Sequence, residues 1–173
     1  MLIARGFGAL TLRAVAAELG ATTGLLTHYF PGKRDLVSHA LELLEQRSAA
    51  RPRRTAAAGL PALRSALLDM LPLTEESAET SRIWVSSWDT ALADPAWSID
   101  YARKYAQGRE RLHALVAAAQ RLGELPDADT ERLATAVQSF VLGLTVQALI
   151  DPSAFPPQRQ IELLDGHLAA LSA

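Results

Sequence analysis

Residues 6–36 of the chain, GFGALTLRAVAAELGATTGLLTHYFPGKRDL, form a segment with the start and stop signals of several short helices. Its first half predicts a short helix over residues 12–19, which Gly20 brings to an end. A second short helix follows Thr22 and ends before the Pro31-Gly32 break. Two short helices joined by a glycine turn predict a helix-turn-helix, whose second helix is the candidate for insertion into the major groove of DNA.

The apolar residues of this stretch recur at helical spacing, which predicts how the two helices pack. Thr11 is placed to cap the first helix, and Leu26 and Phe30 are the expected buried anchors of the second. Both anchors are expected to pack on Val15, Leu19 and Leu36. The predicted buried face of the first helix consists of Leu12, Val15, Ala16 and Leu19.

The predicted exposed side of the second helix is small and polar, with Thr22, Thr23, Thr27 and His28. Hydroxyls and an imidazole can bond to phosphates or base edges, and threonine methyl groups can contact thymine methyl groups. Tyr29 and Lys33 are then expected beside the backbone of the duplex. The alternative is that residues 28–33 are only the end of a helix, with Tyr29 in the core and Lys33 in solvent.

The complete stretch resembles the DNA-binding region of TetR-type transcriptional regulators. The matching residues keep an unbroken register: Gly6, Phe7, Thr11, Leu12, Val15, Ala16, Leu19, Gly20, Thr22, Gly24, Leu26, His28, Tyr29, Phe30, Lys33 and Leu36. Ala21 and Thr27 depart from the pattern, which usually has valine and an aromatic residue there. The resemblance implies that Thr11 bonds a phosphate and that seven further residues face DNA: Thr22, Thr23, Gly24, Thr27, His28, Tyr29 and Lys33.

Residues 22–30, TTGLLTHYF, resemble the choline-responsive BetI-type subgroup of that family. Further along, the series Trp84, Trp88, Ala91, Asp94 and Pro95 and the ending LIDP of residues 149–152 are also similar. The resemblance implies a homodimer formed through the last two helices. It also implies a first helix before Gly6, where only Met1–Arg5 stand, so we expect that helix to be largely missing.

Helical patterns continue to the end of the chain and predict an all-α fold. The expected helices cover residues 33–47, 61–73, 75–93, 96–122, 130–150 and 158–171. We divide the chain into a helix-turn-helix DNA-binding domain, residues 1–50, and a helical effector-binding and dimerisation domain, residues 51–173. The apolar faces of the last two helices exceed what one core needs, which also favours self-association.

The net charge of −2 for 173 residues conceals an asymmetry. Residues 1–54 carry a local charge of +4 and the remainder −6, which is consistent with a first part that faces a polyanion. No cysteine is present, so disulfides and thiol chemistry are excluded. The most apolar stretch, residues 137–150, is shorter than the roughly 20 residues that span a bilayer, and the start does not resemble a signal peptide. We therefore expect a cytoplasmic protein without a membrane span.

Signatures of enzymes are missing from the sequence. The histidines are scattered, and neither a HExxH, a GxSxG, a GxGxxG nor a phosphate-binding loop occurs. We expect neither catalysis nor a metal site, and no cofactor.

Aromatic residues gather within residues 84–105, where they predict a small-molecule effector site. The expected walls are Trp84, Trp88, Trp97, Tyr101 and Tyr105, with His113, Gln138 and Gln147 as polar groups facing the same space. Indole faces attract quaternary ammonium groups, so a cationic or aromatic effector would suit the site, with Asp89 or Asp100 to neutralise a cation. The alternative for each of these residues is ordinary core packing.

Together these features predict a ligand-responsive repressor. It would bind a palindromic double-stranded operator as a homodimer and be released by a small effector. The alternative is a helical ligand-binding or scaffolding dimer whose DNA binding is impaired by the short first helix.

Overall fold

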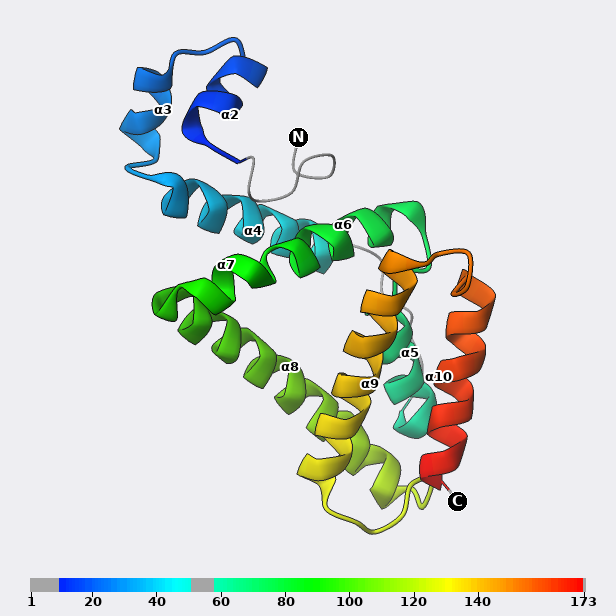
Figure 1. The fold of residues 1–173 in the computed structure, drawn as a ribbon. Coiled ribbons are helices and arrows are strands. Elements are labelled where there is room, and N and C mark those ends of the chain that lie inside the picture. Colours follow the sequence, from blue (N-terminus) through cyan, green and yellow to red (C-terminus); the bar gives the residue numbers. More distant parts are fainter. Residues whose placement is uncertain (1–9, 51–57, 173) are drawn as a thin grey trace. The chain divides into compact units, whose positions relative to one another are not determined.

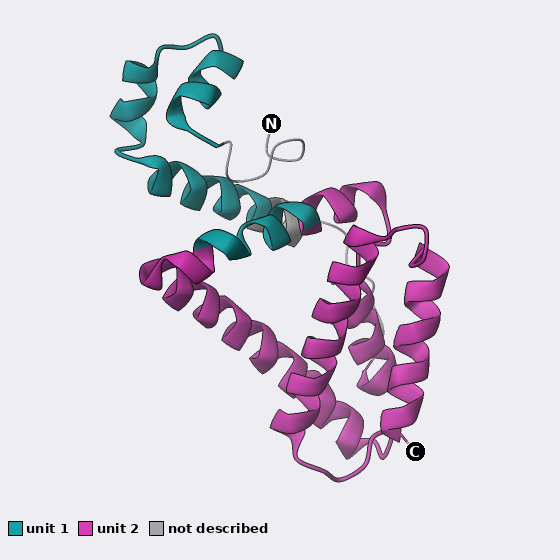
Figure 2. Cartoon of the chain, in the orientation of Figure 1, with its two compact units in different colours: residues 1–52, 82–90 teal, residues 53–81, 91–173 magenta. Residues whose placement is uncertain are grey.

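A computed structural model describes residues 10–50 and 58–172 of the chain. Within these residues it contains nine α-helices and no strand, which confirms the predicted all-α class. The helices form two compact units, one of residues 1–52 and 82–90 and the other of residues 53–81 and 91–173 (Figure 2). The first helix that the family resemblance implied falls outside the described residues.

Unit 1 contains the helix-turn-helix. Its helices are α2 (Leu12–Glu18), α3 (Thr23–Tyr29) and α4 (Lys33–Ala50), in the order that the sequence predicts (Figure 1). Thr11 caps α2 by accepting a hydrogen bond from the Ala14 amide at 3.1 Å. The buried residues of this unit include Leu10, Ala16, Leu26, Leu36, Val37 and Leu41.

The predicted buried face of α2 is wrong at one end. Leu19 is 66% exposed instead of packing on Leu26, and Ala16 is the residue of α2 that is buried. Leu19 is the C-cap of α2 and its amide still bonds to the Val15 carbonyl at 3.0 Å, so it keeps the helical register while its side chain is left in solvent at this end of the helix.

Unit 2 is built around α5 (Gly59–Leu68), α8 (Pro95–Arg121), α9 (Thr130–Ile150) and α10 (Pro157–Ser172) (Figure 1). Their buried leucines, valines and alanines form one hydrophobic core, in which Leu63, Val116, Val141 and Leu164 are fully buried. The last three helices begin and end within about two residues of their predicted bounds. Asp94 and Asp129 cap α8 and α9 by accepting bonds from the amides of Ala96 and Arg132.

Helix α5 begins earlier than predicted. We expected Pro61 in the first position, whereas the helix begins at Gly59, and the preceding Ala58 offers no side-chain cap. Glu124, in the loop between α8 and α9, supplies that cap by accepting a hydrogen bond from the Leu60 amide at 2.6 Å. Gly59 has a φ of +65° and is packed so closely against Glu124 that a Cβ would collide with the carboxylate. A distant residue therefore fixes the start of this helix.

The single helix predicted over residues 75–93 is wrong, because two helices occupy this range. They are α6 (Glu75–Ser86) and α7 (Trp88–Ala93), with the buried Ser87 between them. The Ser87 hydroxyl donates to the carbonyl of Trp84 at 2.6 Å, and its amide is shared between the carbonyls of Ile83 and Trp84. A serine that bonds back to the preceding turn competes with regular helical hydrogen bonds, and here the helix is interrupted.

Helix α9 is long and apolar enough to cross a membrane by length and composition alone. Seven of its residues are buried in unit 2, including Val137, Val141 and Leu144 of the common core. Another side of α9 lies at the surface of the single subunit. Thr135, Ser139, Gly143 and Gln147 form an exposed stripe along it.

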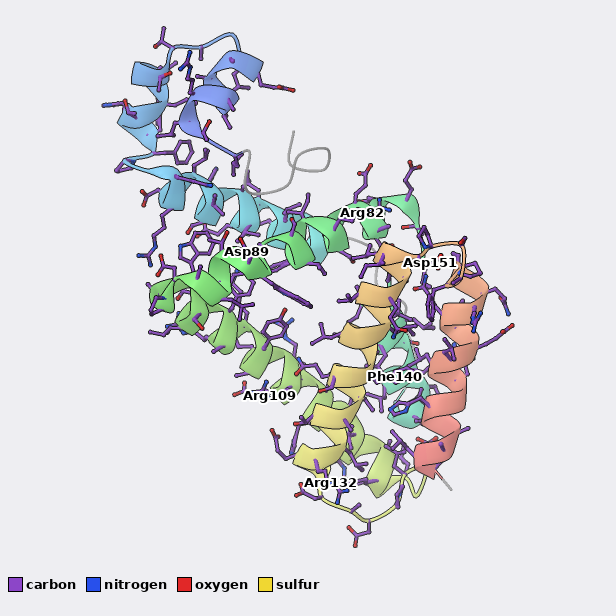
Figure 3. The ribbon with its side chains drawn as sticks, in the orientation of Figure 1. Arg82, Asp89, Arg109, Arg132, Phe140 and Asp151 are labelled. Carbon is purple, nitrogen blue, oxygen red and sulfur yellow. The ribbon has the colours of Figure 1, made fainter. Side chains whose placement is uncertain are left out.

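Two contacts tie α10 to its neighbours in unit 2. The Arg64 guanidinium of α5 donates to both carboxylate oxygens of Asp165, at 2.5 and 2.9 Å, and these bonds lower the pKa of Asp165. The ring of Phe140 in α9 stacks on His167 at 4.0 Å between centroids (Figure 3). Burial lowers the pKa of His167, because a charged imidazole loses solvation there.

Candidate nucleic-acid interface and effector site

The turn between α2 and α3 sets the direction of the candidate reading helix. Gly20 has a φ of +63°, a conformation that other residues rarely adopt. The chain then returns to α2 through a bond of 2.9 Å from the Ala21 amide to the Ala16 carbonyl. Thr22 caps α3 by accepting from the Leu25 amide at 3.2 Å. These local bonds explain why the sequence predicted α3 to within a residue.

Only Leu26 of α3 is buried, and it fixes which side of this short helix faces the unit. The residues predicted to meet DNA are all exposed, namely Thr11, Thr22, Thr23, Gly24, Thr27, His28, Tyr29 and Lys33. Tyr29 is 67% exposed, so the alternative that places its ring in the core is wrong. The structure thus collects these residues on the surface of unit 1.

The threonine hydroxyls of this surface differ in what they still offer to a ligand. Thr11 and Thr22 use oxygen lone pairs as helix caps, which leaves each hydroxyl proton available to a phosphate oxygen. Thr27 instead donates its proton to the Gly24 carbonyl at 2.9 Å and keeps its lone pairs. It can therefore accept from an amino group on a base edge. His28 and Tyr29 contact each other edge to face at 5.4 Å.

The residues predicted for the effector site are distributed over both units. Trp84 and Trp88 belong to unit 1, whereas Trp97, Tyr101 and Tyr105 lie on α8 of unit 2. Trp97 and Tyr101 are each 5% exposed. The rings of Tyr101 and Tyr105 lie 6.4 Å apart.

Gln138, a polar residue that the sequence predicts for this site, contacts the segment of α8 that carries Tyr105. Gln138 of α9 is buried and donates from Nε2 to the Tyr105 carbonyl at 3.2 Å. Gly108 gives it room, since a Cβ there would lie 2.8 Å from the same nitrogen. The structure therefore brings Gln138 of α9 to the part of α8 that carries Tyr105.

Two other polar groups lie elsewhere. His113 and Gln147 are both exposed, so the prediction that they share an interior space with Gln138 is wrong. His113 follows the buried Leu112 on α8, and one step along a helix turns a side chain by about 100° toward solvent. Asp100 is also at the surface, where it pairs with Arg103 at 3.2 Å.

Sequence reasoning missed Thr145. This residue is 7% exposed, and its hydroxyl has no hydrogen-bond partner among the residues that the structure describes. It lies seven residues after Gln138, two turns along the same side of α9. A buried hydroxyl without a partner is costly, so Thr145 is a candidate for contact with a ligand. The spacing from Gln138 is the signal that could have identified it.

The outer surface of α9 and α10 is uncharged over most of its length. The exposed stripe of α9 is matched on α10 by Leu163, Gly166, Ala169 and Ala170. Gly143 and Gly166 have open space in front of them, since no atom lies within 4 Å of an added Cβ. Leu164 and Leu168 of α10 are buried in the core of unit 2, so the side of α9 and α10 left at the surface consists mainly of small and polar residues instead of the apolar face that the sequence predicts.

Comparison with protein families decides where the chain belongs. Residues 59–173 match the family described as BetI-type transcriptional repressor, C-terminal, and residues 1–40 match the bacterial regulatory proteins of the tetR family. The chain belongs to the tetR family. This membership confirms the resemblance drawn from residues 6–36 and identifies the chain as a transcriptional regulator, not an enzyme.

Relatives of this tetR-family regulator agree along almost the whole chain. The transcriptional regulator BetI of Paraburkholderia phymatum is 24% identical over 97% of this chain and 85% of its own length. PksA of Bacillus subtilis is 25% identical over 99% and 84%.

Solved structures show the same fold. A transcriptional regulator from Rhodococcus sp. Rha1 superimposes with a TM-score of 0.85 at 22% identity, over 98% of this chain and 89% of that one. A regulator from Saccharomonospora viridis, solved in complex with choline, has a TM-score of 0.84 at 20% identity, over 97% and 89%.

Proposed function

We propose that this tetR-family regulator is a cytoplasmic repressor that binds a palindromic operator as a homodimer and is released by a small effector. The observation that carries the proposal is the exposed side of α3. This helix buries one residue and presents threonines, His28 and Tyr29 to solvent. Such a helix suits the major groove, and two copies on a twofold axis would read two half-sites.

In this proposal Thr11, Thr22 and Lys33 bond to phosphates, while Thr23, Thr27 and His28 meet base edges. Tyr29 lies beside the sugar-phosphate backbone. Gly24 has the most informative role, because its added Cβ would meet nothing closer than the Thr22 hydroxyl at 4.0 Å. The folded unit therefore has no need of a glycine there, although glycine weakens a helix. Close approach of DNA supplies the need.

The operator is tested with duplex DNA from immediately upstream of the chain's own gene, by fluorescence anisotropy at several salt concentrations. We expect Lys33→Ala to weaken binding and to lower the salt slope by about 2 per dimer, since each lost phosphate contact removes about 0.9. Lys104→Ala removes the same charge from unit 2 and is the matched control. An unchanged slope for Lys33→Ala would contradict the phosphate contact.

The dimer is proposed to form through the uncharged surface of α9 and α10, where Gly143 and Gly166 let a second copy approach closely. Gly166→Gln fits the single subunit because the space is open, but it would collide with the partner. We expect light scattering to report a monomer for Gly166→Gln and a dimer for Ala114→Gln, a change at an exposed position of α8. A dimeric Gly166→Gln would place the interface elsewhere.

The effector is proposed to be a quaternary ammonium compound such as choline, which the Saccharomonospora viridis regulator holds. Within unit 2 its contacts would be Trp97, Tyr101, Tyr105, Gln138 and Thr145, and Trp84 and Trp88 remain predictions from the sequence. The buried polar side chains here are an amide and a hydroxyl. Aromatic faces would therefore provide the attraction for a cation.

Thr145→Val tests the effector site through two changes of opposite sign. Removal of an unpartnered buried hydroxyl should raise the Tm of the free protein and weaken choline binding measured by calorimetry. Ser98→Ala, which removes an exposed hydroxyl from α8 outside the proposed dimer surface, should change neither. The neutral carbon analogue of choline should bind more weakly than choline. Equal binding of both compounds would contradict a site for cations.

A chain that dimerises and binds choline but no DNA would instead be the ligand-binding dimer that the sequence left as an alternative.

A further inference from the structure

An exposed leucine interrupts the polar surface of α3. Leu25 is 50% exposed although it is flanked by the polar or small residues of the reading helix. It lies directly before the buried Leu26, so its side chain is turned about 100° away from the core side. The core of unit 1 therefore does not account for an apolar side chain at this position.

The neighbours of Leu25 place it on the side of α3 that was assigned to DNA. Thr22 precedes it by three residues and Tyr29 follows it by four, so the three share one edge of the helix. Thr22 is already bonded to the Leu25 amide at 3.2 Å, which holds this first turn in place. The Leu25 side chain thus stands between a proposed phosphate contact and an exposed tyrosine.

We propose that Leu25 contacts the C5-methyl group of a thymine in each half-site and thereby sets the base preference there. A leucine side chain can neither donate nor accept a hydrogen bond. Among the groups that base pairs present in the major groove, the thymine methyl is the apolar one. This proposal rests on the proposed function, because it requires α3 to enter the major groove.

The structure distinguishes this contact from those of the neighbouring threonines. Thr27 offers lone pairs that can accept from an amino group of a base, whereas Leu25 offers only apolar surface. Leu25 therefore favours thymine over cytosine at its position, because cytosine lacks the C5-methyl group. Recognition of this base pair by an apolar contact is therefore independent of the salt-dependent phosphate contacts.

The test uses the full chain and a duplex selected by it from a pool of random sequences. Each thymine of one half-site and its symmetry mate are replaced in turn by deoxyuridine, which removes the methyl and keeps every hydrogen-bonding group. We expect one such pair to weaken wild-type binding by about three- to fivefold per half-site, the effect of one buried methyl group. Leu25→Ala should bind the unmodified duplex more weakly and lose this sensitivity.

Leu43→Ala is the matched control, because Leu43 is a leucine of α4 in the same unit with 42% exposure. It should keep the wild-type response to deoxyuridine. Wild-type binding that ignores every replacement, or a Leu25→Ala variant that still responds, would overturn the role of Leu25 while leaving operator binding intact. If the random pool yields no duplex that binds specifically, the proposed function and this inference both fail.

Discussion

The α3 helix and the α9–α10 pair depend on their surroundings in different ways. Helix α3 buries one side chain, whereas α9 alone buries seven and α10 buries three. Most side chains of α3 can therefore be exchanged without loss of packing, whereas the buried side chains of the pair cannot. Substitutions in α3 should therefore mainly change contacts with a ligand, whereas substitutions in unit 2 should first change the free energy of unfolding.

The largest change in the free energy of unfolding is expected for a fully buried residue of α10. Leu164→Ala should destabilise unit 2 by about 2–5 kcal/mol, because Leu164 is fully buried and the change leaves a cavity. Its neighbour Leu163 is 38% exposed, and Leu163→Ala should cost far less. Urea denaturation followed by circular dichroism measures both. Similar losses for the two variants would break the distinction between the inner and outer sides of α10.

Gly59 and Gly166 are two glycines of unit 2 at which the same substitution should change stability in opposite directions. Gly59→Ala should cost about 1–3 kcal/mol, since the residue has a positive φ and its new methyl would collide with Glu124. Gly166→Ala places the same methyl in open space on a helix, so it should stabilise the single subunit. Thermal denaturation distinguishes them, and a tolerated Gly59→Ala would show that the Glu124 cap can move.

In α3, Gly24 is a position at which stability and operator binding should change in opposite directions. Gly24→Ala should raise the stability of unit 1 by about 0.5–1 kcal/mol, because alanine favours a helix and the space is open. The same change should weaken operator binding severalfold. Hydrogen exchange of α3 measures the first effect and fluorescence anisotropy the second. If both properties improved together, no close approach of DNA at Gly24 would be required.

The smallest change is expected in the dependence of stability on pH. Burial lowers the pKa of His167 below its ordinary value of 6.5, so the unfolded chain takes up a proton before the folded one does. Stability is therefore unaffected above that value and falls as the pH drops below it. We expect a decrease in Tm of about 2 °C or less between pH 7 and 5.5. In His167→Phe this dependence should diminish.

Local signals explain what could be predicted from the sequence. Thr11 was recognisable as a cap, and the helix that follows it begins where expected. Leu19 keeps the register of α2 and is nevertheless exposed, because the helical period does not reveal whether another element covers the end of a helix. The break at Ser87 depends on a bond to Trp84, and nothing in the residue types requires that bond.

The residues predicted for the effector site also show where prediction from the sequence fails. Helix α9 is apolar around most of its circumference, so its periodicity does not reveal which polar group faces the interior. Gln138 faces the interior and Gln147 does not, and Thr145 was overlooked. Contacts with α8 decide between them, as the bond from Gln138 to Tyr105 illustrates.

The cap that Glu124 provides for α5 also has a consequence for the order of synthesis. Its carboxylate and the Leu60 amide are 64 positions apart in the chain. A ribosome makes α5 long before it makes the residue that completes the first turn of that helix. The nascent α5 therefore stays frayed at its beginning until the whole of α8 has emerged, and unit 2 closes late in translation.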